Sequence, residues 1–194
     1  MLDSSSLTDS ELVRRLREGS EPAFMAIYER YHRMVHRFAW QMSGSQTIAD
    51  EVTQEVFLAL IRRPERFDEE RGALDAFLYG IGRNHVFKIL ECDRRYVGCD
   101  EEAELAGQAE PVQPDALSAL LAGQKREQLR QAVLSLPAAY REALVLCDLE
   151  ELSYEEAARK IDCPVGTVRS RLHRARSLLA EKLVAGWAGK RCAV

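Results

Sequence analysis

Apolar positions between Leu152 and Leu179 follow the period of two short helices. Ser153 is followed three residues later by Glu156, which predicts a capping box at the start of the first helix. Pro164 disfavours helical geometry at the preceding residue, so this helix is expected to end near Asp162. The apolar face of the first helix comprises Tyr154, Ala157, Ala158 and Ile161. That of the second comprises Val165, Val168, Leu172, Ala175 and Leu179.

The other faces of the second helix are rich in arginine. Its polar residues are Arg169, Ser170, Arg171, His173, Arg174 and Arg176. The nearby acids are few, with Asp162 before the helix and Glu181 after this run. Two short helices with a cationic second helix are typical of a helix-turn-helix, in which the second helix enters the major groove of DNA. A basic face that is only solvated is the alternative, but such a face normally mixes charges of both signs.

Helical periodicity also dominates the first half of the chain. Capping and stop signals predict four helices: Thr8 to Gly19, Ser20 to Gly44, Thr47 to the residue before Pro64, and Leu74 to Arg94. The third is expected to bury an apolar stripe and to present a polar outer surface. That outer surface consists of Asp50, Glu51, Gln54 and Glu55. No β-branched alternation with hairpin turns occurs, so the predicted fold class is all-α.

Charge composition divides the chain in two. The segment from Tyr96 to Gln124 contains no Lys or Arg, but it holds six acids and two prolines. This composition is typical of a flexible acidic linker. We therefore expect two small helical domains, at 1–96 and 124–194, joined by a linker at 97–123.

The overall composition restricts the classes of function. Apolar residues make up 46% and charged residues 30%, which indicates a packed core. The net charge of −4 means that any DNA binding must come from local basic patches. The longest apolar run, 56–61, is too short to cross a membrane, and no export signal is visible at the N-terminus. A cytoplasmic protein that does not insert into membranes is expected.

Cysteine and histidine usage gives little sign of catalysis. Five cysteines without a C-x-x-C pair predict reduced thiols rather than a disulfide framework or a zinc site. A redox or metal pair formed by Cys92 and Cys99 is the alternative. The chain has no Gly-rich phosphate loop and no nucleophile elbow, and its four histidines are scattered. We expect neither an enzyme nor a bound metal or cofactor.

Motifs in both halves resemble one family. Glu-Glu-Ala-Ala at 155–158 and the run from Cys163 to Arg176 resemble region 4 of bacterial sigma factors, closest to the extracytoplasmic-function (ECF) group. The residues at 50–57 and 77–84 resemble region 2 of the same family. Each motif is moderately specific alone, but together and in this order they are strongly indicative.

This resemblance implies that the chain binds core RNA polymerase and directs it to promoters. The arginine-rich helix would then read the minus-thirty-five element, because the guanidinium fork suits both guanine edges and phosphates. The residues implied in this contact are Arg169, Ser170, Arg171, His173, Arg174 and Arg176.

The same resemblance implies that the loop at 66–72 and the following helix recognise and melt the minus-ten element. The residues implied are Arg66, Phe67, Arg71, Tyr79, Arg83, Asn84 and Lys88. Exposed aromatic residues could stack on unpaired bases. Core packing is the alternative role for Tyr79 and is favoured for Phe77, and a plain surface position is the alternative for Asn84.

The resemblance also implies partners. The outer face formed by Asp50, Glu51, Gln54 and Glu55 would dock on the clamp helices of the largest polymerase subunit, with further contacts to the polymerase flap. An anti-sigma factor would hold the chain inactive, and the two domains would move independently when free. A helix-turn-helix regulator that binds operator DNA without polymerase is the second hypothesis, and gel shifts with isolated duplex would discriminate the two.

Overall fold

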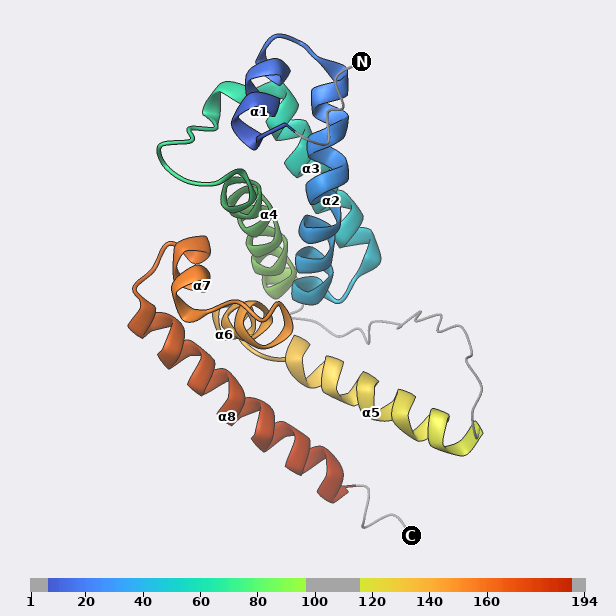
Figure 1. Cartoon of the computed structure of the whole chain (residues 1–194). Coiled ribbons are helices and arrows are strands. Elements are labelled where there is room, and N and C mark those ends of the chain that lie inside the picture. The colour runs from blue at the N-terminus through green and yellow to red at the C-terminus, as the bar shows by residue number, and fades with distance from the viewer. Residues whose placement is uncertain (1–6, 97–115, 190–194) are drawn as a thin grey trace.

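The computed structural model describes the backbone of residues 7–96 and 116–189, and the side chains of residues 7–92 and 123–184. Within these ranges every regular element is a helix, so the predicted all-α class is confirmed. The elements are α1 (Asp9–Arg17), α2 (Glu21–Ser43), α3 (Gln46–Arg62), the short 3-10 turn η2 (Pro64–Arg66), α4 (Leu74–Tyr96), α5 (Ala116–Leu134), α6 (Ala138–Leu144), the π-helical turn η3 (Val145–Leu149), α7 (Tyr154–Ile161) and α8 (Val165–Gly189). We call α1–α4 the N-terminal domain and α5–α8 the C-terminal domain (Figure 1).

The ends of α2 and α3 follow the predicted capping chemistry. The Ser20 hydroxyl accepts a hydrogen bond from the backbone of Ala23, and Ser45 does the same for Ile48. Gly44 ends α2 with a φ of 72°, a left-handed conformation that glycine adopts without steric cost. Its N–H donates to the carbonyl of Trp40, so the sharp turn into α3 is satisfied by backbone bonds.

The N-terminal domain buries the apolar stripes of its helices against one another. The largest fully buried side chains include Leu12, Ile27, Met42, Leu60 and Leu78. Gly82 lies where α4 crosses these helices, and a Cβ at this position would stand 3.4 Å from a methyl group of Val56. A methyl group at residue 82 would therefore make only ordinary van der Waals contacts, and α4 continues as one helix through Gly82.

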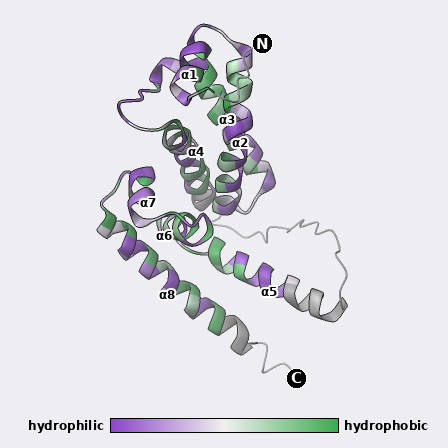
Figure 2. Ribbon diagram, viewed as in Figure 1, coloured by the Kyte–Doolittle hydropathy of each residue, from purple (hydrophilic) through white to green (hydrophobic). Residues whose placement is uncertain are grey.

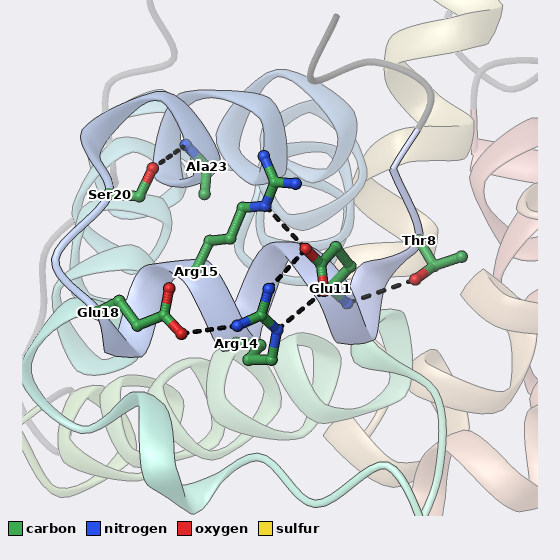
Figure 3. A network of polar contacts seen from close by, with 7 residues as sticks. All are labelled: Thr8, Glu11, Arg14, Arg15, Glu18, Ser20 and Ala23. Atoms are coloured by element: carbon green, nitrogen blue, oxygen red, sulfur yellow. Dashed lines mark hydrogen bonds and ion pairs between the residues drawn. The ribbon is translucent and has the colours of Figure 1, made fainter. Parts of the chain in front are cut away.

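Helix α1 is held by a dense set of exposed ion pairs (Figure 3). The Thr8 hydroxyl accepts a hydrogen bond from the Glu11 backbone at 3.3 Å, which is one half of the capping box that the spacing of Thr8 and Glu11 allows. The Glu11 carboxylate instead accepts hydrogen bonds from Arg14 and Arg15. These guanidinium groups lower the pKa of Glu11 to about 2. The reciprocal half of the box was expected from spacing and is not formed.

The C-terminal domain packs α6 and α7 against α8. Ser153 and Glu156 form the predicted capping box of α7, in which each side chain receives the other residue's backbone N–H. Asp162 ends α7 at a φ of 50°, and Pro164 follows. Buried Leu172 and Ala175 of α8 pack with Val133, Leu136 and Leu144 in the core of this domain.

A π-helical turn separates α6 from the helix-turn-helix. Regular α-helix ends at Leu144, and Val145–Leu149 form the π-helical turn η3. The N–H of Glu150 bonds to the carbonyl of Val145, and Glu151 then takes a φ of 56°. Such turns are rare and often lie at functional sites.

Helix α5 extends into the segment that the sequence predicted as a linker. Residues 97–115 lie outside the described part of the chain, so the predicted flexibility there stays a prediction. Helix α5, however, begins at Ala116, whereas the linker was expected to reach residue 123. The segment after Pro114 is rich in Ala and Leu, which are strong helix formers and outweigh its lack of charge.

The two domains are in contact in this structure. Helix α7 lies beside α4, and α5, α6 and η3 contact α2 (Figure 1). One buried apolar cluster continues from the N-terminal helices into Val145, Leu146 and Ile161. The two helical domains therefore share a contact in this conformation, and their independent movement when free stays a prediction. None of the described helices has the length and apolar character needed to span a membrane.

Candidate nucleic-acid interface

The polar residues of α8 point away from the core, as the helical period predicted. Arg169, Ser170, His173, Arg174 and Arg176 are exposed, and Arg171 is half-buried. Hydrophobic and hydrophilic residues alternate along this helix (Figure 2). The buried positions Val168, Leu172 and Ala175 face the core, so this helix presents its cations to solvent.

Two of the α8 arginines already have partners inside the domain. Arg176 donates to both carboxylate oxygens of Asp148, at 3.0 and 2.6 Å, and this pairing raises its pKa. The guanidinium of Arg169 lies 5.5 Å from the centre of the Tyr154 ring. Among the described residues, Arg171 and Arg174 form no ion pair. These two are the α8 arginines best placed to donate hydrogen bonds to a phosphate or a guanine edge.

The loop between α3 and α4 does not present its aromatic residue. Phe67 is only 4% exposed and packs edge-to-face on Phe77, with 5.6 Å between ring centres. Arg17 of α1 donates to the Phe67 carbonyl at 2.7 Å, which holds the loop against the domain. The expected availability of Phe67 for base stacking is therefore wrong in this conformation, while the packing role favoured for Phe77 agrees with these contacts.

Tyr79 is buried as well, at 3% exposure. Its ring lies 4.5 Å from that of Phe38, and its hydroxyl donates to Glu142 of α6 at 2.9 Å. Burial, and then the neighbouring Glu142 carboxylate, raises the pKa of Tyr79 well above its usual range. The core-packing alternative for Tyr79 is the one that this conformation shows.

Arg83 is engaged by the same carboxylate. Its Nε and Nη2 atoms both donate to Glu142, the latter at 3.0 Å, and this hydrogen bonding raises the pKa of Arg83. The guanidinium also lies 4.6 Å from the centre of the Phe87 ring. Arg83, one of the residues implied at the minus-ten element, is paired in this conformation with Glu142 of the other domain.

The remaining residues expected at the minus-ten element are accessible. Asn84 and Lys88 are exposed on α4, one helical turn apart. Arg66 and Arg71 are exposed in the loop, where Arg71 pairs with Asp68 at 3.3 Å. The residues expected at the minus-ten element thus divide into two groups. Arg66, Arg71, Asn84 and Lys88 are exposed, whereas Phe67, Tyr79 and Arg83 are covered or engaged by other parts of the protein.

The expected polymerase-binding face is open. Asp50, Glu51 and Gln54 are exposed along α3, and Glu55 is half-buried. Asp50 accepts from Gln46 at 3.2 Å and lies 3.1 Å from His36. A shallow pocket beside this face is lined by aromatic and imidazole rings of α2 and by α3. Its lining includes Phe24, Tyr28, His32, His36, Asp50, Gln54 and Phe57.

The charged contacts between the domains were missed by sequence reasoning. Lys160 of α7 lies 2.6 Å from Asp75 of α4, and Arg37 of α2 pairs with Glu150. Glu142 was not singled out from the sequence, yet this carboxylate is fully buried among apolar residues of α6. A charged residue inside an apolar stripe was the available signal, since a buried charge needs a partner.

No cluster of three or more possible metal ligands occurs in the part of the chain that the structure describes. Cys92, Cys147 and Cys163 are free thiols. The alternative pair of Cys92 with Cys99 falls partly outside the described residues, at Cys99. Burial raises the pKa of the Cys147 thiol, which disfavours the reactive thiolate.

Comparison with known proteins matches both halves of this architecture. Residues 27–96 match Sigma-70 region 2, and residues 126–179 match Sigma-70 region 4. The chain is 34% identical over 188 residues to the ECF RNA polymerase sigma-E factor of Escherichia coli K12, covering 93% of this chain and 96% of that relative. It is 30% identical over 166 residues to the ECF sigma factor SigE of Mycolicibacterium smegmatis, covering 86% of this chain and 63% of that relative.

A comparison with solved structures also finds a sigma factor. The sigma factor RpoE of Bartonella quintana, solved in complex with the anti-sigma factor NepR, superposes with a TM-score of 0.63 at 26% identity. That comparison covers 82% of this chain and 96% of the other. The helices and their order thus define a two-domain sigma factor of the sigma-70 type. On the sequence comparisons, the chain belongs to the ECF RNA polymerase sigma factors, which are transcription initiation factors.

Proposed function

We propose that this chain binds core RNA polymerase through the outer face of α3, reads the minus-thirty-five element with α8, and captures the minus-ten element with the loop at 66–72 and α4. The observation that carries this proposal is the match to sigma-E over nearly the whole chain, together with the outward cations of α8. In this assignment the chain acts as a cytoplasmic specificity factor and performs no chemistry itself.

The charges of the two faces suit these different partners. Asp50 and Glu51 make the α3 face acidic, which favours a basic surface on the polymerase. Arg171 and Arg174 make the α8 face basic, which favours DNA. Opposite charges at the two faces keep the chain from binding promoter through the surface meant for polymerase.

We also propose an anti-sigma factor as a regulator of this chain. The support is the Bartonella quintana relative, which was solved with such a partner. An inhibitor of this kind would compete with polymerase, so it would act on binding to core rather than on DNA contacts alone.

Run-off transcription with purified core polymerase tests the proposed function. Core polymerase plus this chain should give discrete transcripts from genomic fragments, while either component alone should give none. If the chain neither binds core nor produces discrete starts, the proposal fails. Tight, polymerase-free binding to a palindromic duplex would instead support a helix-turn-helix regulator.

A further inference from the structure

Three ionic contacts cross from one domain to the other. Glu142 of α6 pairs with Arg83 of α4, Glu150 pairs with Arg37 of α2, and Lys160 of α7 pairs with Asp75 of α4. In two of the three, a carboxylate of the C-terminal domain occupies an arginine of the N-terminal domain. Basic groups of the N-terminal domain are thus neutralised from within the molecule.

The Glu142 contact resembles the way an arginine holds a phosphate. Two guanidinium nitrogens of Arg83 donate to the two oxygens of one carboxylate, a fork geometry that also suits phosphate groups. The carboxylate is fully buried and accepts a third hydrogen bond from Tyr79. While Glu142 holds this position, Arg83 cannot offer the same donors to a nucleic-acid strand.

Helix α7 covers the neighbouring aromatic ring. The Lys160 amine lies 2.6 Å from the Asp75 carboxylate and 5.5 Å from the centre of the Tyr79 ring. Its side chain is only 13% exposed, so the amine sits inside the contact rather than at its margin. The same helix is the first helix of the helix-turn-helix, and its position therefore depends on the N-terminal domain.

We propose that these contacts form an interdomain latch that closes the minus-ten surface of the free chain. The latch consists of Glu142 on Arg83 and Tyr79, Lys160 on Asp75, and Glu150 on Arg37. Capture of the minus-ten strand then requires α6 and α7 to leave α4. This inference rests on the proposed function, because it assumes that the surface around Tyr79 and Arg83 meets DNA.

The chemistry of the latch allows it to open. Its charged groups regain water when the domains part, so no unpaired buried charge is left behind. Arg37 and Asp75 are already 61% and 36% exposed, and ion pairs near solvent contribute little net stability. A ligand that binds only the open state sees an affinity reduced by the fraction of chains that are open.

A charge swap at the Asp75–Lys160 pair tests the latch in the full-length chain. The variants are Lys160→Asp, Asp75→Lys and the double swap Asp75→Lys/Lys160→Asp. Arg159→Asp is the matched control, because Arg159 is exposed on the same helix and its side chain donates to the Glu155 carbonyl of its own helix rather than to the N-terminal domain. The probe is a labelled single-stranded oligonucleotide from the non-template minus-ten strand of a promoter mapped by run-off transcription.

The change in oligonucleotide affinity caused by Lys160→Asp is the decisive result, because the latch and simple electrostatics predict opposite signs for it. The substitution removes positive charge, so electrostatics alone would weaken DNA binding. The latch predicts that affinity for the oligonucleotide rises instead, by about tenfold, because Lys160→Asp replaces an attraction to Asp75 by a repulsion between two contacting carboxylates. Asp75→Lys should also raise the affinity, and the double swap should return it close to the wild-type value.

The result that overturns the latch is a Lys160→Asp chain that binds the oligonucleotide no more tightly than Arg159→Asp. A double swap that fails to reverse the single variants would overturn it too, provided that circular dichroism shows all chains folded. Promoter-specific run-off by wild-type holoenzyme is measured in parallel. If that activity is present, failure of the swap removes the latch and leaves the proposed function standing.

Discussion

The two surfaces expected to meet DNA differ in how far the protein itself occupies them. On α8, Arg171 and Arg174 carry no ion pair within the described chain, and the polar face is turned to solvent. On α4, Tyr79 and Arg83 are held by Glu142 of the other domain. In this conformation the surface proposed to read the minus-thirty-five element is therefore exposed, and the surface proposed to capture the minus-ten element is partly covered.

This difference shows which parts of a functional surface are local properties. The exposed face of α8 follows from the hydrophobic periodicity of that helix, because the buried side chains of Val168, Leu172 and Ala175 lie on one face. The covering of α4 depends on residues about sixty positions away in the chain. An arginine on a helix can thus be assigned to DNA by its motif and still be paired with protein.

The largest expected effect is on the open surface. Arg174→Ala should reduce promoter-specific transcription by about tenfold to a hundredfold, since one base or backbone contact of this kind contributes about 1–3 kcal/mol. Binding to core polymerase should not change. Run-off yield and a core-binding assay measure the two separately. Lys182→Ala, further along α8, is the control, and equal losses in both variants would mean that α8 acts only through general charge.

The next effect concerns the acidic face of α3. Asp50→Lys should weaken binding to core polymerase by about tenfold, because complementary charge governs such encounters. The difference in affinity between the variant and the wild-type chain should grow as the salt concentration is lowered. Glu69→Lys makes the same charge change in the loop at 66–72, away from this face, and should leave core affinity unchanged. Fluorescence anisotropy of labelled chain against core measures both, and equal weakening would mean that the surface is misassigned.

Two glycines should respond in opposite directions. Gly44 has a φ of 72°, and a Cβ there would lie 2.4 Å from the Leu134 side chain of α5. Gly44→Ala should lower the free energy of unfolding by about 1–2 kcal/mol, the cost of a left-handed residue. Gly80 lies inside α4 with open space around it, so Gly80→Ala should raise the free energy of unfolding by about 1 kcal/mol. Thermal unfolding followed by circular dichroism gives the signs, and a stabilised Gly44→Ala chain would contradict the strain.

The smallest effect is a pH dependence confined to α1. Glu11 titrates at about 2 in the folded chain because Arg14 and Arg15 donate to its carboxylate, whereas its ordinary pKa is 4.5. A lowered folded pKa contributes stability above pH 4.5 that is lost as the pH falls toward 2. Titration of the Glu11 side chain by NMR checks the pKa. Arg14→Gln should move it back toward 4.5, and an unmoved pKa would reject Arg14 as the main cause.

Most of the helices could be predicted from the sequence, because capping residues and hydrophobic periodicity act locally. Ser153, Glu156 and Asp162 define α7 as expected, and Gly44 ends α2. The errors arose where distant parts of the chain meet. Phe67 was expected to be an exposed aromatic residue of the loop, but it packs on Phe77. Glu142 was not recognised as a contact residue, because its partner Tyr79 lies on the distant helix α4.

The most direct test of the covered minus-ten surface is zero-length carbodiimide crosslinking of the unmodified chain. This reagent joins a carboxylate to an amine only when the two are in contact, and Asp75 lies 2.6 Å from Lys160. Mass spectrometry should find the Asp75–Lys160 crosslink in the free chain, and the crosslink should be lost in the open promoter complex with polymerase. Its absence from the free chain, or an equal yield in the open complex, would contradict the account.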